Sequence, residues 1–161
     1  IVKDFGLPLM LANRQHKLKL EAQRKQSYLK RLEFLMDLEI EAVAEFSDFI
    51  SEFEPEFSNP NMDWDQACED FAISLGAVEK RLKTFHYKYS IVLSDEIVGL
   101  LEEQRSRAAE AKFFYDITDD CEPIVTQQQR DEAGQILETL IGVREQMVKA
   151  VRDGRSLFEP K

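Results

Sequence analysis

Residues 64–89 read WDQACEDFAISLGAVEKRLKTFHYKY, and the spacing of their apolar side chains decides the fold class. Eight apolar residues are separated by alternating steps of four and three: Trp64, Cys68, Phe71, Leu75, Val78, Leu82, Phe85 and Tyr89. Such steps place every member on one face of an α-helix, because the helix has about 3.6 residues per turn. The stretch therefore predicts one continuous amphipathic helix.

Three further helices follow from the same kind of spacing on either side of this stretch. They cover about residues 9–54, 94–115 and 126–154, and the connections between them are short. Helices joined by short connections pack as antiparallel neighbours. The sequence therefore predicts an all-α protein, an antiparallel up-and-down four-helix bundle with an overlong, projecting first helix.

The first helix carries two patterns along its length. From Leu29 onward apolar residues recur at seven-residue intervals, with Glu39 as a polar interruption, whereas the preceding residues lack this repeat. A sustained seven-residue repeat is typical of a helix that packs against other helices. We therefore divide the chain into an apolar and basic N-terminal arm at 1–28, a helical bundle at 29–154 and a flexible tail at 155–161.

Local signals indicate where the last two helices begin and end. Ser94 is a suitable N-cap for the helix that follows it. Thr126 and Gln129 have the spacing of a capping box, in which each side chain bonds the backbone amide of the other residue. Gly154 is a natural stop for the final helix.

Composition narrows the class of protein. The 161 residues are 43% hydrophobic and 32% charged, which suits one globular domain better than a disordered chain. The net charge of −10 argues against a nucleic-acid binder. The two cysteines and two histidines form neither a disulfide framework nor a zinc-ligand spacing, and no apolar run is long enough to span a bilayer. We expect no metal and no cofactor.

Neither histidine lies in a catalytic or metal-ligating motif. A di-iron site in a helical bundle needs a Glu-x-x-His motif on each of two helices. The residues three positions before His16 and His86 are Asn13 and Lys83, so this motif is missing. No motif pairs His86 with a serine or cysteine nucleophile. We therefore expect no catalytic residues and a non-enzymatic protein.

Charged residues are segregated along the chain. Between Leu32 and Val78 there are thirteen acids and no Lys or Arg, whereas residues 14–31 carry a single acid, Glu21. We call residues 14–31 the basic segment, and its seven basic residues are Arg14, Lys17, Lys19, Arg24, Lys25, Lys30 and Arg31. A basic segment on an otherwise acidic protein indicates a negatively charged partner.

The apolar residues 5–12 lie directly before the basic segment. An apolar stretch followed by Lys and Arg is typical of the cytoplasmic end of a transmembrane helix. We therefore expect a helical interaction or scaffold module, the cytosolic part of a membrane-anchored protein, whose basic segment contacts anionic lipid or an acidic protein partner. The plainer interpretation is that the basic segment is only the solvated part of a long helix.

Two other functions stay open. The chain could be a soluble sensor domain that binds a ligand in an apolar pocket between helices. The aromatic residues proposed to line that pocket are Phe46, Phe49, Phe53 and Phe85. Alternatively, the first helix could self-associate through a weak seam of Leu11, Leu18 and Ala22.

Overall fold

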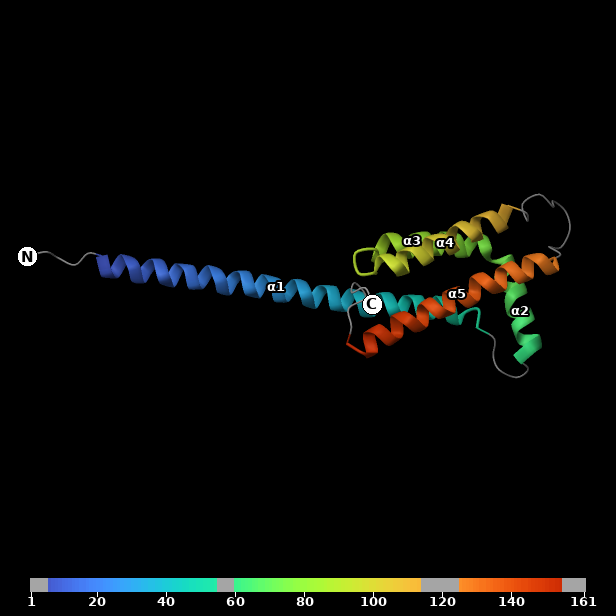
Figure 1. Ribbon diagram of the computed structural model, residues 1–161, viewed down its shortest axis with the longest axis horizontal. Coiled ribbons are helices and arrows are strands. Elements are labelled where there is room, and N and C mark those ends of the chain that lie inside the picture. Colours follow the sequence, from blue (N-terminus) through green and yellow to red (C-terminus); the bar gives the residue numbers. More distant parts are fainter. Residues whose placement is uncertain (1–5, 55–59, 114–124, 155–161) are drawn as a thin grey trace, which may run out of the picture. The chain divides into compact units, whose positions relative to one another are not determined.

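A computed structural model describes residues 6–54, 60–113 and 125–154, and every regular element in these ranges is an α-helix (Figure 1). The helices are α1 (Gly6–Ser51), α2 (Pro60–Ile73), α3 (Leu75–Tyr89), α4 (Asp95–Phe113) and α5 (Gln127–Arg152). The prediction of an all-α protein is confirmed over these ranges. The predicted tail at 155–161 lies outside the described residues.

The chain divides into two units, each of which we describe by itself. The first unit is Ile1–Asp37, which contributes the N-terminal part of α1. The second, which we call the compact unit, is Leu38–Lys161 and holds the rest of α1 together with α2 to α5. The sequence places a boundary between residues 28 and 29, and that boundary stays a prediction.

The helix predicted over 64–89 is two helices, because the chain bends at Ser74. α2 ends and α3 begins on either side of this residue, and α2 leaves the line of α3 (Figure 1). The Ser74 amide donates to the carbonyl oxygens of both Asp70 and Phe71, at 3.1 and 3.0 Å. A serine close to a glycine, here Gly76, is a common cause of a sharp bend. The prediction of one continuous helix is therefore wrong.

Within the compact unit, α3 and α4 form an antiparallel hairpin, and α5 packs against α2 and α4. Two side-chain contacts show the direction of the hairpin. Glu79 near the start of α3 lies 3.9 Å from Lys112 at the end of α4, and His86 near the end of α3 is in hydrogen-bond contact with Glu102. Every helix of the unit contributes to the buried core. Its largest apolar side chains include Phe46, Phe71, Leu82, Leu101, Ile136, Leu140 and Met147.

The predicted end signals of α4 and α5 are present. The Ile97 amide donates to the Ser94 hydroxyl at 3.3 Å, as expected of an N-cap. Thr126 and Gln129 form the complete capping box, and this prediction is confirmed. Gly154 follows α5 with φ +66°, the left-handed conformation in which a glycine ends a helix without steric cost.

The seven-residue repeat of α1 reaches the core only in its second half. Leu29 and Met36 are 54% and 61% exposed, whereas Ile50, at the same position of the repeat, is fully buried. Leu29 and Met36 belong to the first unit, whereas Ile50 belongs to the compact unit. The same spacing is therefore buried only where other helices pack against it.

Candidate functional site

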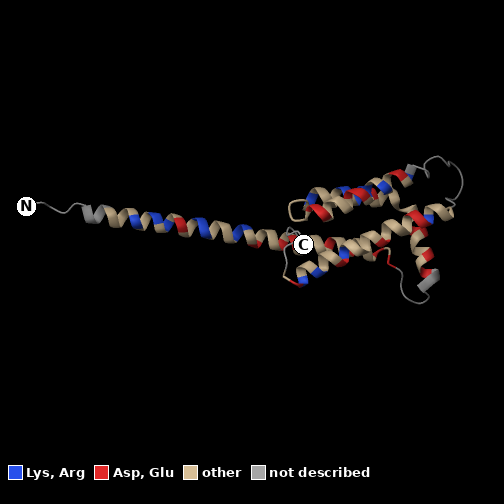
Figure 2. Cartoon of the chain, in the orientation of Figure 1, with Lys and Arg blue, Asp and Glu red and all other residues tan. Residues whose placement is uncertain are grey.

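Ion pairs join the helices of the compact unit. Arg81 of α3 donates two hydrogen bonds to Glu52, at 2.5 and 3.0 Å. Arg130 of α5 lies 3.9 Å from Glu69 of α2. Both acids come from the stretch that has no Lys or Arg, and both arginines come from helices that follow it (Figure 2). Part of the charge segregation in the sequence therefore serves pairing between helices.

The densest group of charges joins α1 to α3. The Lys88 Nζ donates to Glu41 at 2.7 Å and to Glu45 at 2.8 Å, and the Tyr89 hydroxyl donates to the same two carboxylates at 3.0 and 2.6 Å. The Lys88 Nζ also lies 4.7 Å from the centre of the Tyr89 ring, within range of a cation–π interaction. Two adjacent residues of α3 thus bind two acids that lie one turn apart on α1.

These contacts shift several pKa values. Hydrogen bonds from Lys88 lower the pKa of Glu41 and raise that of Lys88 itself. Burial opposes ionisation of Glu45, but hydrogen bonds from Lys88 and Tyr89 outweigh it and lower its pKa. Burial, reinforced by Glu45, raises the pKa of Tyr89 to about 12. At neutral pH the carboxylates and the lysine are charged and the phenol is neutral. The group therefore links α1 to α3 through hydrogen bonds and ion pairs.

His86 is held against α4. Its Nδ1 is in hydrogen-bond contact with Glu102 Oε1, and the other oxygen of Glu102 accepts from Arg105 Nε and Nη2 at 3.0 and 2.7 Å. This arrangement orients the imidazole, as a carboxylate does in many catalytic sites. No serine, threonine or cysteine in the described part of the chain is hydrogen-bonded to it.

A buried amide connects α4 to α5 through an arginine. Gln104 is 2% exposed, and its Oε1 lies 3.4 Å from Arg107 Nη1, which donates to it. Arg107 also donates to Glu132 at 2.8 Å and to Gln135 at 2.9 Å, both on α5. The polar exception in the apolar stripe of α4 is thus satisfied within the fold, as buried polar groups usually are.

The basic segment differs from all these groups, because its charges have no ion-pair partner among the described residues. All seven of its Lys and Arg side chains are exposed. None of them forms an ion pair with another residue in the described part of the chain. At about 100° per residue the seven lie around most of the helix instead of on one face. Figure 2 shows this concentration of Lys and Arg along the first part of α1.

Large apolar side chains are also exposed along α1. They are Met10, Leu11, Leu18, Leu20, Tyr28, Leu29, Leu32, Phe34, Met36 and Ile40. Leu11 and Leu18, which belong to the seam suggested for self-association, are 54% and 57% exposed, and Ala22 is exposed as well. Large apolar side chains that stay exposed along one helix make it a candidate interaction surface.

No family model, curated protein or solved structure matches this chain.

The four phenylalanines suggested as pocket walls pack chiefly on other aromatic rings. The Phe46 ring centre lies 5.0 Å from that of Phe85 and 6.0 Å from that of Phe49. Phe53 stands edge-on to Phe71, with ring centres 5.0 Å apart. Contacts at these distances are typical of a packed aromatic core.

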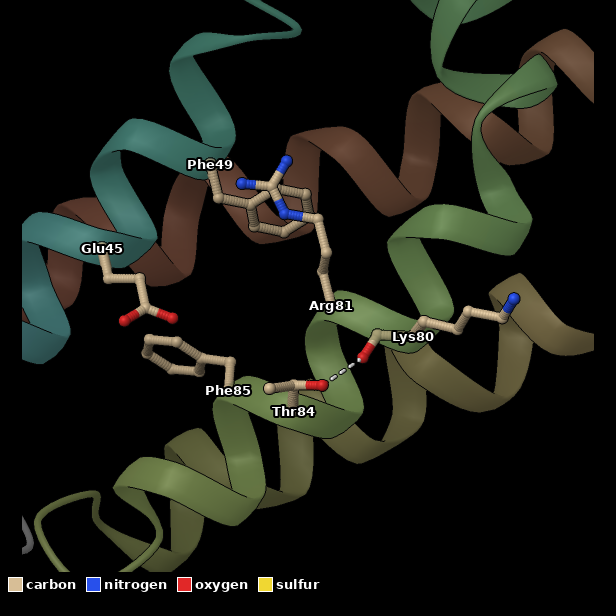
Figure 3. A pocket seen from close by; sticks show the side chains of 6 residues that line it. All are labelled: Glu45, Phe49, Lys80, Arg81, Thr84 and Phe85. Carbon is tan, nitrogen blue, oxygen red and sulfur yellow. Dashed lines mark hydrogen bonds between the residues drawn. The ribbon is translucent and has the colours of Figure 1, made fainter.

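An open hollow of about 200 Å³ lies beside these rings (Figure 3). Phe49 and Phe85 line it, together with Glu45, Lys80, Arg81 and Thr84. The guanidinium of Arg81 lies over the Phe49 ring, 4.4 Å from its centre, and partly covers it (Figure 3). The hollow is smaller than the cavities of about 300–1,000 Å³ that usually hold small-molecule ligands.

Sequence reasoning missed the group around Lys88. The spacing of Glu41 and Glu45 could have predicted a nearby cation. Two acids four residues apart on a helix repel each other unless a cation lies between them. The sequence also places Lys88 next to an aromatic residue on the core stripe of its helix. It does not show which acids that lysine meets, because 47 positions separate Lys88 from Glu41.

Proposed function

We propose that this protein is a non-enzymatic helical interaction module whose basic segment docks on an anionic membrane surface. The observation that carries the proposal is the contrast between the two kinds of charge in the chain. Acids of α1, of the turn that follows it and of α2 are paired with cations from α3 and α5. In contrast, the seven cations of the basic segment are exposed and unpaired among the described residues. Charges that fold stability does not use are available for a partner.

The strength of the electrostatic effect supports this interpretation. The basic segment has seven cations and one acid, a net charge of +6, so the rest of the chain must carry −16 to give the total of −10. Each Lys or Arg near an anionic lipid surface contributes about 1 kcal/mol. The basic segment therefore attracts such a surface by several kcal/mol, while the acidic remainder is repelled and orients the molecule with its basic segment toward the lipid.

The distribution of the cations favours a surface over a folded acidic protein. A protein partner with a defined acidic groove would be matched by cations on one side of the helix. The cations of the basic segment lie around most of α1, so every side of this helix presents some of them to a flat anionic surface and docking needs no defined groove. Anionic lipid of this kind faces the cytosol, so the proposal places the protein at the inner face of a membrane.

The proposal includes the predicted arrangement of the helices. A four-helix bundle with an overlong first helix would present the basic segment on the part of α1 that lies outside the bundle. The length of α1, 46 residues, supports this arrangement. No helix in the described ranges is long and apolar enough to cross a bilayer. An anchor preceding the basic segment stays a prediction from the sequence.

Vesicle binding tests the proposal. The full chain is sedimented with vesicles of neutral phosphatidylcholine and with vesicles that also contain phosphatidylserine, at low and high salt. We expect binding to the anionic vesicles only, and loss of binding at high salt because exposed charges are screened. Replacement of four lysines by glutamine should weaken this binding at least about tenfold; they are Lys17, Lys19, Lys25 and Lys30.

A matched variant separates a specific effect from a change in total charge. It replaces four exposed cations of the compact unit by glutamine, namely Lys80, Lys83, Lys149 and Arg152. This variant should bind anionic vesicles as the unchanged chain does. Equal loss in both variants, or no binding of the unchanged chain, would overturn the proposal. Retention on immobilised polyglutamate without retention on vesicles would assign an acidic protein as the partner instead.

A further inference from the structure

We propose that Ser27 is a phosphorylation site whose phosphate cancels much of the positive charge of the basic segment. The segment contains no other serine and no threonine, and the side chain of Ser27 is exposed. The inference rests on the proposed function in one respect, because the modification would weaken the membrane contact of the same segment. The modifying enzyme is a serine kinase, and its phosphate donor is a nucleoside triphosphate.

Three cations surround Ser27 on α1. Arg24 lies three residues before it, and Lys30 and Arg31 lie three and four residues after it. Residues at these spacings are neighbours on a helix, with Cβ atoms about 5–6 Å apart. All three cations lie within about 60° of Ser27 around the helix axis. A phosphate on Ser27 is therefore within reach of all three side chains.

These three cations are available to a phosphate. Each is exposed, and none forms an ion pair with another residue in the part of the chain that the structure describes. A phosphoserine carries a charge of about −1.5 to −2 at pH 7, and it forms charge-assisted hydrogen bonds with nearby Lys and Arg. The modification would therefore lower the net charge of the basic segment from +6 to about +4. It would also hold three of the seven cations against the helix.

Thr84 of the compact unit has similar neighbours in sequence but a different environment. Arg81 lies three residues before it and Lys88 lies four residues after it. Both of these cations are already bound to carboxylates of the chain. The Thr84 hydroxyl itself donates to the carbonyl oxygen of Lys80 at 3.0 Å. Of the two positions, Ser27 is therefore the one whose neighbouring cations are unpaired.

The surroundings of Ser27 also suit a kinase. Arg24 and Lys25 lie three and two residues before it, and a kinase with an acidic substrate groove attracts a target preceded by such cations. Every residue of α1 from 10 to 34 is exposed. Local unwinding of α1 around Ser27 therefore removes no buried side chain from a core, so the segment can enter the kinase at a low cost.

The transfer follows the ordinary chemistry of a kinase. A bond forms between Ser27 Oγ and the γ-phosphorus of the nucleoside triphosphate, while the bond from that phosphorus to the bridging oxygen of the β-phosphate breaks. The nucleoside diphosphate leaves, and the serine proton passes to the catalytic aspartate of the kinase. No other co-reactant is needed.

Phosphorylation of the full chain tests the site. The unchanged protein and Ser27→Ala are incubated with ATP and the catalytic subunit of cyclic-AMP-dependent protein kinase, and mass spectrometry locates the phosphate. We expect phosphate on Ser27 and none on Thr84. The phosphorylated chain should bind phosphatidylserine vesicles about thirtyfold more weakly than the unmodified chain, because about two charges are cancelled. Ser27→Ala treated with the kinase should bind as it does untreated.

Phosphate on other residues but not on Ser27, or no phosphate at all, would overturn the inference. Unchanged vesicle binding after Ser27 is phosphorylated would overturn it as well. Absence of vesicle binding by the unmodified chain would overturn the proposed function alone, because the position of the phosphate and its pKa are measured without lipid.

The pKa of the phosphate shows whether the neighbouring cations hold it. The second pKa of a phosphoserine is about 6, and cations beside it lower this value. Titration followed by phosphorus NMR should give a pKa below about 6 in the phosphorylated chain and a higher pKa in Lys30→Gln/Arg31→Gln. Lys17→Gln/Lys19→Gln removes the same charge at least eight residues from Ser27 and should leave the pKa unchanged. Equal pKa values in all three proteins would refute the pairing.

Discussion

Arg144 of α5 binds the carboxylate of Glu54, just beyond the end of α1, although 90 positions separate the two residues. The guanidinium donates from both terminal nitrogens, at 2.6 and 2.5 Å, in the two-pronged geometry that matches a carboxylate. The two side chains are 18% and 35% exposed. Partial removal from water makes this the least solvated carboxylate–arginine pair among those described.

Removal of this pair should destabilise the compact unit. We expect Arg144→Ala to lower the free energy of unfolding by about 1–2 kcal/mol, between the value of an exposed ion pair and that of a buried one. Arg152→Ala removes an exposed arginine from the last turn of the same helix and should change stability by less than about 0.5 kcal/mol. Urea denaturation of both variants measures the difference. Equal effects would mean that the Arg144–Glu54 pair adds nothing.

Stability should fall at acid pH, because three carboxyl groups besides Glu41 and Glu45 have lowered pKa values. Hydrogen bonds from Arg81, Arg144 and Arg105 lower the pKa values of Glu52, Glu54 and Glu102. A carboxyl whose pKa is lower in the folded state stabilises the fold above its unfolded pKa of about 4.5. This contribution is lost as the pH falls below about 4.5 and through the folded values.

Denaturation midpoints between pH 7 and pH 3 measure this loss. The double variant Arg81→Gln/Arg144→Gln removes two of the three cations and should show a shallower dependence on pH. The same pH dependence in the variant and in the unchanged chain would contradict the assignment of the shifts to these pairs.

Alkaline pH should act through Tyr89. Its pKa of about 12 lies above the ordinary value of 10.0, since burial and the Glu45 carboxylate both favour the neutral phenol. The folded state therefore holds the proton more tightly than the unfolded state, and stability should be lost as the pH rises from about 10 toward 12. Tyrosinate absorbance should show a transition near pH 12 that is absent in Tyr89→Phe. Its persistence in that variant would refute the assignment to Tyr89.

The apolar stripe of residues 64–89 shows how far sequence pattern reaches. Phe71, Leu75, Val78, Leu82 and Tyr89 are all buried. The spacing of apolar residues did not predict the bend at Ser74, because the alternation of four and three residues continues unchanged across it. The combination of Ser74 and Gly76 was the available signal, but such residues also occur in straight helices.

Pairing between distant charges could not be read from the sequence. The acidic stretch and the start of α5 could be identified from the sequence. Each depends only on residues that are neighbours along the chain. The choice of Glu41 and Glu45 by Lys88 depends on how α1 packs against α3, which local spacing does not encode. Likewise, the exposure of Leu29 and Met36 depends on which helices lie beside them, although their spacing equals that of buried residues.

The last prediction concerns Gly134 of α5, where α2 comes close to the backbone. A Cβ atom at Gly134 would lie 3.0 Å from Sγ of Cys68 and 4.0 Å from Nε1 of Trp64. We expect Gly134→Ala to lower the free energy of unfolding by about 1–2 kcal/mol, because overpacking outweighs the helix propensity that alanine adds. Gly142→Ala, where nothing lies within 4 Å, should raise it by about 0.5–1 kcal/mol.

A second substitution shows whether the sulfur is the cause. In the background of Cys68→Ala the opposing atom is gone, so adding Gly134→Ala should cost less than it does beside the native cysteine. Chemical denaturation of the two single variants and the double variant gives this difference as a coupling free energy. If Gly134→Ala stabilises the protein as much as Gly142→Ala does, then α2 and α5 do not approach each other closely at this glycine.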